Sequence, residues 1–176
     1  MSQHWFEHLA AWLKAKGRHR MIYRDVDKSI DPRGFEEYLE RFYILSTPWI
    51  GVYLHKFWSD DDDGLHDHPW NSISVLLHGC YIEEMPERQT VPYGPTVKKK
   101  RYPLHPVFFV RSKYDAHRIT LLRHEDAETE EEYYWVGEPI WSLFVRFGTK
   151  RRIWGFYRNG GWKPAEVQSR KEMTTV

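Results

Sequence analysis

Two histidines separated by one residue, His66 and His68, have the spacing with the clearest chemical meaning. Side chains at positions i and i+2 of a β-strand project from the same face, so two imidazoles could reach one point. A third ligand would have to come from elsewhere, and His117 is a candidate because it directly precedes a strand-like segment, residues 118–122. Neutral imidazoles favour Fe, Zn, Ni, Cu or Mn over Ca or Mg. The chain contains ten histidines, so the alternative is a chance pair that binds no metal.

A carboxylate and two aromatic residues accompany the histidines. Glu83 alternates with Tyr81 along the strand expected after Gly79, and it could be a fourth ligand or a base; an exposed strand glutamate is the ordinary alternative. Tyr81 and Trp70 could line a substrate pocket or pack in the core. Asp67 is predicted to point away from its two histidine neighbours, where it would support a ligand or make a loop contact.

Three arginines, Arg111, Arg118 and Arg146, fall on predicted strands. A buried arginine is costly unless it is paired with a carboxylate or with an anion of the substrate. At least one of the three could therefore bind an anionic substrate. The alternative for each is a position on a solvent-exposed strand face.

The elements that must position these residues are mostly short strands. From Trp49 onward, runs rich in branched and aromatic residues are separated by clusters of Gly, Pro, Asp and Asn, which is typical of an all-β array. Many short strands in succession favour a barrel or sandwich over a parallel sheet. The predicted strands are residues 50–58, 72–77, 80–85, 98–102, 107–111, 118–122, 140–147 and 153–157.

Two helices are predicted before the strands. Residues 5–13 carry apolar side chains at helical spacing and are followed by lysines and Gly17. Asp31 as the N-cap and Pro32 at the first helical position predict a second helix. Its apolar positions would be Phe35, Tyr38, Leu39 and Phe42.

Two segments of the sequence resemble the motifs of the cupin superfamily. The stretch from His66 to Gly79 is similar to the first cupin motif, in which two histidines separated by one residue are followed by a Glu position and then a Gly. Residues 106–122, with the sequence DAHRI near their end, resemble the second motif, which carries the remaining histidine ligand. The resemblance covers residues 50–147. It implies an all-β, double-stranded β-helix (jelly-roll) barrel with N-terminal helices, in which His66, His68 and His117 hold one metal.

Two positions depart from the cupin pattern. Ser72 stands where many cupins carry a metal-binding Glu, and residues 112–114 replace the Pro-x-Gly turn before the last histidine. The first departure implies an open three-histidine site, similar to that of thiol dioxygenases such as cysteine dioxygenase. A 2-oxoglutarate oxygenase is disfavoured because it uses a His-x-Asp pair.

Length and composition limit the remaining choices. The 176 residues suit one domain, with a helical segment (1–45) on the outside of a barrel (49–160) and a frayed tail (167–176). The formal net charge of +1 does not favour nucleic acid or a membrane as partner. The basic clusters 98–101 and 150–152 could contact phosphates, but charged turns or a protected edge strand are favoured. The single cysteine, Cys80, and the absence of a leader-like segment lead us to expect a cytoplasmic protein.

These observations predict a metal-dependent oxidoreductase, a non-haem Fe(II) dioxygenase that acts on a small anionic or thiol substrate. Zn, Mn or Ni are the alternative metals. The alternative functions are a metal-dependent hydrolase or isomerase, with Glu83 as base, and a non-catalytic module that binds a small ligand. A homodimer is a further expectation, because cupin barrels often pair through edge strands.

Overall fold

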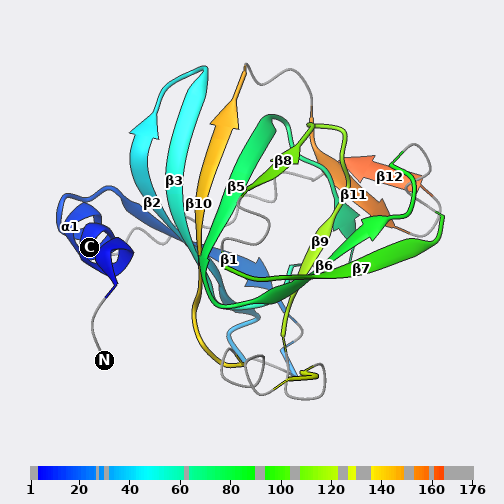
Figure 1. The fold of residues 1–176 in the computed structure, drawn as a ribbon, viewed down its shortest axis with the longest axis horizontal. Helices are drawn as coiled ribbons and strands as arrows, with labels where there is room; N and C mark the ends of the chain where they lie inside the picture. Colours follow the sequence, from blue (N-terminus) through cyan, green and yellow to red (C-terminus); the bar gives the residue numbers. More distant parts are fainter. Residues whose placement is uncertain are drawn as a thin grey trace.

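The computed structural model describes residues 4–26, 28–29, 32–61, 64–89, 94–103, 108–122, 127–129, 136–148, 153–158 and 161–164. Within them, one α-helix lies outside an assembly of antiparallel strands (Figure 1). The helix is α1 (Trp5–Ala15), as the sequence predicted. Its buried residues Phe6, Ala10 and Leu13 pack against a cluster that includes Phe42 and Trp141. No helix in the described part of the chain is long and apolar enough to cross a membrane.

The larger layer is a six-stranded antiparallel sheet (Figure 1). Its strands, in spatial order, are β1 (His19–Asp25), β2 (Phe35–Ser46), β3 (Ile50–Phe57), β10 (Ile140–Phe147), β5 (Asn71–His78) and β8 (Phe109–Arg111).

Two three-stranded sheets form the opposite layer. One contains β12 (Gly161–Pro164), β11 (Gly155–Arg158) and β4 (Leu65–His66), and the other contains β7 (Thr96–Arg101), β6 (Tyr81–Pro86) and β9 (Arg118–Leu121). An antiparallel bridge between His66 and His117 joins them: each backbone N–H donates to the carbonyl of the other residue, over 2.9 and 3.0 Å. The seam between the two small sheets is therefore made by two of the predicted metal ligands.

The predicted second helix is wrong. Residues 35–46 form strand β2, and the predicted N-cap, Asp31, lies outside the described residues. Both faces of β2 are covered, because Phe42 packs in the cluster beneath α1 whereas Leu39 and Arg41 line an internal cavity. A strand covered on both faces shows no polar and apolar alternation, so its aromatic residues gave a helical pattern instead.

The strands predicted from residue 50 onward are confirmed as β3 and β5 to β11, with small differences at their ends. Strands β1, β4 and β12 were not predicted. Gly79 makes the turn that takes the chain from β5 in one layer to β6 in the other, and its φ is +75°. A Cβ at this position would lie 3.1 Å from the Cα of Ile140 and 3.2 Å from the carbonyl oxygen of Pro139. Glycine is thus required both by conformation and by space.

Candidate metal centre

The three predicted histidines converge at the seam between the small sheets. One ligand atom from each of His66, His68 and His117 can be chosen so that all three lie within 4.8 Å of one another. The ring centroids are 4.9, 5.0 and 5.1 Å apart in the three pairs. The Nε2 atoms of His68 and His117 are 2.8 Å apart. The backbone bridge fixes His66 and His117, and His68, two residues after the end of β4, turns its ring to the same point.

The surroundings favour the neutral imidazoles that metal binding needs. Burial, followed by the charge of Arg111, lowers the pKa of His117, and burial lowers the pKa of His68 well below its usual value. The Nδ1 of His117 lies 3.2 Å from Oε1 of Glu83, so its Nε2 faces the cluster. The Nδ1 of His66 lies 4.0 Å from a carboxylate oxygen of Asp61. A carboxylate behind a ligating imidazole is a usual means of orienting it, and Glu83 has this position behind His117, whereas the distance from His66 to Asp61 is too long for a hydrogen bond.

Glu83 lies behind His117 and not among the ligand atoms. Its side chain is fully buried and receives hydrogen bonds from Arg101 Nε at 2.8 Å and from Arg111 Nε at 2.9 Å. A second nitrogen of Arg111 also donates to it. Burial alone would raise the pKa of Glu83, but His117 and Arg111 outweigh burial and hold the pKa below its usual range. This carboxylate, predicted as a fourth ligand or base, is instead the anion of a buried ion-pair cluster.

Asp67 connects the histidine segment to the C-terminal hairpin. It is fully buried, and its carboxylate accepts hydrogen bonds from the Gly155 backbone N–H at 2.9 Å, the Trp162 indole at 3.0 Å and the Tyr157 hydroxyl at 3.2 Å. Its own N–H donates to the Gly155 carbonyl at 3.1 Å. It points away from the metal ligands, as predicted, and it fixes the segment that follows β4, between His66 and His68, against β11 and β12.

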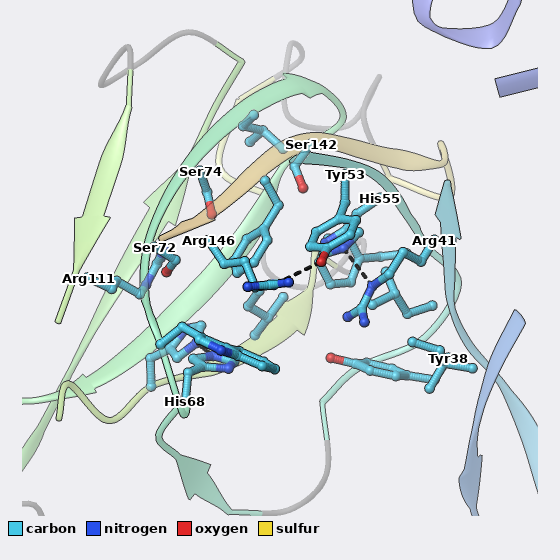
Figure 2. A pocket seen from close by; sticks show the side chains of 18 of the residues that line it. Tyr38, Arg41, Tyr53, His55, His68, Ser72, Ser74, Arg111, Ser142 and Arg146 are labelled. Carbon is cyan, nitrogen blue, oxygen red and sulfur yellow. Dashed lines mark hydrogen bonds between the residues drawn. The ribbon is translucent and has the colours of Figure 1, made fainter. Parts of the chain in front are cut away.

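A cavity of about 360 Å³ opens beside the histidines, between the two layers. His68 and His117 form part of its wall, and Leu39, Phe57, Leu76 and Ile119 supply apolar surface. None of the described residues that line it carries a carboxylate, whereas Arg41, Arg111 and Arg146 do line it (Figure 2). The cavity is at the small end of the range for small-molecule sites, roughly 300 to 1000 Å³.

The predicted substrate-binding residues divide into two groups. Arg111, Arg146, Trp70 and Tyr81 line the cavity, and burial raises the pKa of the Tyr81 hydroxyl to about 12, which keeps it protonated. Arg118 does not line it. It pairs with Glu84 on the other face of β6, because alternate residues of a strand face opposite sides, so the cavity gives its predicted role in substrate binding no support.

Comparisons with known proteins were made by sequence and by fold. No protein-family model matches the chain, and no curated protein matches it in sequence. By fold, DMSP lyase DddQ from Ruegeria pomeroyi DSS-3 is similar over 91% of this chain and 72% of that one, with 12% identity and a TM-score of 0.52. A cupin superfamily protein from Desulfitobacterium hafniense DCB-2 matches over 62% and 76%, with 8% identity and a TM-score of 0.41. A cupin domain from Bordetella pertussis Tohama I matches over 64% and 95%, with 13% identity and a TM-score of 0.40.

The chain has the cupin fold. The predicted fold class is thus confirmed, and the three-histidine group occupies the interior of this fold between its two layers. Ser72, at the place where many cupins were expected to carry a Glu, is buried on β5 and lines the cavity.

Sequence reasoning missed several polar residues of the cavity. Arg41 was hidden because residues 35–42 were assigned to a helix, and His55, whose Nε2 accepts a hydrogen bond from Arg41 Nε at 3.1 Å, was one histidine among ten. Burial, followed by the charge of Arg41, lowers the pKa of His55 well below its usual value. His55 must be neutral, with no proton on Nε2, to accept this hydrogen bond from Arg41. The clearest available signal was the alternation of Tyr53, His55 and Phe57 along a predicted strand.

Proposed function

We propose that this cupin is a metal-dependent oxidoreductase, a non-haem Fe(II) dioxygenase that acts on a small anionic or thiol substrate. The observation that carries the proposal is the position of the imidazole cluster. His68 and His117 stand in the wall of a cavity that is large enough for a small molecule and whose charged lining is cationic. A substrate in the cavity would therefore lie directly beside a metal held by the histidines.

The residues present fit such a metal. Three imidazoles, with no carboxylate among the grouped atoms, suit Fe, Zn, Mn or Ni and leave coordination positions for other molecules. His66, His68 and His117 would hold the ion, and Fe(II), when bound, supplies redox chemistry with dioxygen that side chains lack. The carboxylate of Glu83 lies 3.2 Å from the Nδ1 of His117, where its negative charge favours a proton on that nitrogen and leaves Nε2 to bind the metal.

The hydrolase or isomerase alternative receives less support from the cavity. It needs a general base within reach of the substrate, and Glu83 was the candidate. Glu83 does not line the cavity, and its carboxylate is occupied by Arg101 and Arg111, so it is a weak proton acceptor. A mechanism in which a redox metal carries the chemistry places no such demand on the side chains.

The test is oxygen consumption by the full chain after anaerobic purification and loading with Fe(II). We expect uptake that depends on an added small carboxylic acid or thiol and that disappears in His117→Ala. The control is His8→Ala, because His8 is exposed on α1. No uptake with any of these substrates, or equal uptake by His117→Ala, would contradict the proposal. Full turnover of a substrate without oxygen, by the zinc-loaded protein, would point to the hydrolase or isomerase instead.

A further inference from the structure

Among the described residues, two arginines in the cavity have only neutral partners. Arg146 donates from Nε to the Tyr53 hydroxyl at 2.9 Å and from a terminal nitrogen to the Thr47 carbonyl at 2.7 Å. Arg41 donates from Nε to His55. No carboxylate oxygen of the described residues lies within 4.0 Å of a nitrogen of either guanidinium.

The neighbouring arginines are different. Arg101 and Arg111 both bind the carboxylate of Glu83, so their charge is already compensated inside the protein. Arg111 lines the cavity but is occupied in this way. A buried guanidinium without a counter-charge is costly, and it is retained where a ligand supplies the missing anion. Within the described part of the chain, Arg41 and Arg146 are therefore the cavity arginines that lack an anion.

The two guanidinium groups face the same part of the cavity. Both lie against the ring of Tyr53, with the Arg41 carbon 5.3 Å and the Arg146 carbon 6.0 Å from its centroid. Figure 2 shows them on either side of the Tyr53 hydroxyl, with their terminal nitrogens turned into the cavity. The Arg146 guanidinium also lies 5.0 Å from the ring centroid of Trp70, two residues after His68.

A buried hydroxyl supplies a second, independent sign of a ligand. Ser72 is 1% exposed, and its Oγ has no hydrogen-bond partner. Ser72 is the cross-strand neighbour of Arg146, and both side chains line the cavity (Figure 2). A buried hydroxyl that lacks a partner loses its hydrogen bonds to water without replacement, so a ligand atom is expected beside it.

The structure assigns to Arg41, Arg146 and Ser72 the binding of the oxyanion of a small organic acid. The rest of the molecule lies along the apolar wall formed by Leu39, Leu76 and Phe144. The position of the reacting end of this acid, beside His68 and His117, rests on the proposed function. The binding of the oxyanion does not, because it needs only the two guanidinium groups and the hydroxyl.

The test is isothermal titration calorimetry on the metal-free full chain. The probes are short fatty acids from propionate to hexanoate, each with its matched amide and its matched phosphonate. We expect an acid to bind at least about tenfold more tightly than its amide, since the amide brings no charge to the guanidinium groups. Comparison of the carboxylate with the phosphonate identifies which oxyanion the site prefers.

Variants then locate the site. Arg146→Gln and Arg41→Gln are each expected to weaken acid binding about tenfold or more and to leave amide binding unchanged. Ser72→Ala should weaken acid binding by a smaller factor. The matched control is Arg118→Gln, which removes an arginine outside the cavity and should bind as wild type. Circular dichroism establishes that each variant is folded.

Three results would overturn the assignment. They are equal binding of acids and amides by the wild type, no binding of any acid at millimolar concentration, and an undiminished preference for acids in both arginine variants. The first two need no variant, so a folding defect leaves the test intact. Because no metal is present, acid binding without oxygen uptake would refute the proposed function alone, and oxygen uptake without acid preference would refute the anion site alone.

Discussion

Replacement of Glu83 by Gln removes the one negative charge at the centre of a buried cluster. In the wild type the carboxylate binds two guanidinium groups and approaches the Nδ1 of His117 at 3.2 Å. The amide keeps the size of the side chain, but its nitrogen is a donor that faces other donors, and Arg101 and Arg111 lose their counter-charge. The two arginine side chains are only 14% and 9% exposed, so water compensates little.

The expected cost is large because one member of a buried ionic group is removed. Breaking such a group typically destabilises a protein by about 3 to 5 kcal/mol. The matched control is Glu84→Gln, one residue further along β6, where the pair with Arg118 lies on the other face. That arginine side chain is 30% exposed, and partly exposed pairs contribute about 0.2 to 1 kcal/mol.

Urea unfolding of the metal-free variants measures both effects. We expect Glu83→Gln to lower the unfolding free energy by several kcal/mol and Glu84→Gln by at most about 1 kcal/mol. In the metal-loaded protein, loss of the partner of His117 should also weaken metal affinity about 10- to 100-fold. If the two variants had equal stability, or if Glu83→Gln matched the wild type, the view of Glu83 as the anion of the cluster would be refuted.

Three further predictions concern stability. Asp67→Ala removes a carboxylate that accepts three hydrogen bonds. It should lower the free energy of unfolding in urea by about 3 kcal/mol and speed up hydrogen exchange in β11 and β12. A decrease of the unfolding free energy below about 1 kcal/mol would contradict this prediction. Gly79→Ala should lower the free energy of unfolding more than Gly137→Ala does. Both glycines have a positive φ, but only at Gly79 do backbone atoms lie within 3.2 Å of the added Cβ. Equal decreases in the two variants would show that the close approach of Ile140 and Pro139 to Gly79 is unimportant. His55 has a folded pKa below its unfolded value of 6.5, so its contribution is complete above that pH and is lost as the pH falls below it. His55→Gln should therefore flatten the decline of stability between that pH and about 5, by up to about 1.4 kcal/mol per pH unit. An unchanged slope would contradict a lowered pKa of His55 in the folded state.

The metal ligands were predictable to unequal degrees from the sequence. His66 and His68 follow from strand parity, which is a local property of two residues. His117 depended on the resemblance, because the backbone bridge that places it beside His66 joins segments far apart in the chain. Eight of the strands from residue 50 onward, β3 and β5 to β11, were predictable because turn residues separate them, whereas β2 was not, since both of its faces are covered.

The supporting charges were the least predictable part of the site. Glu83 was recognised as important, but its role depends on Arg101 and Arg111, which reach it from two other strands. A single sequence contains no register between β6, β7 and β8, so it does not show which charges meet. Arg41 was missed because β2 was predicted as a helix, and the position of Arg41 in the site depends on a cavity that only the folded chain forms.

The central claim is that His66, His68 and His117 hold one divalent metal beside the cavity. Elemental analysis of the anaerobically purified chain after Fe(II) loading and gel filtration tests it most directly. We predict close to one metal ion per chain in the wild type and in His8→Ala, and its loss in His117→Ala with the fold retained by circular dichroism. A wild type that retains no metal, or a His117→Ala variant that retains as much as the wild type, would contradict the claim.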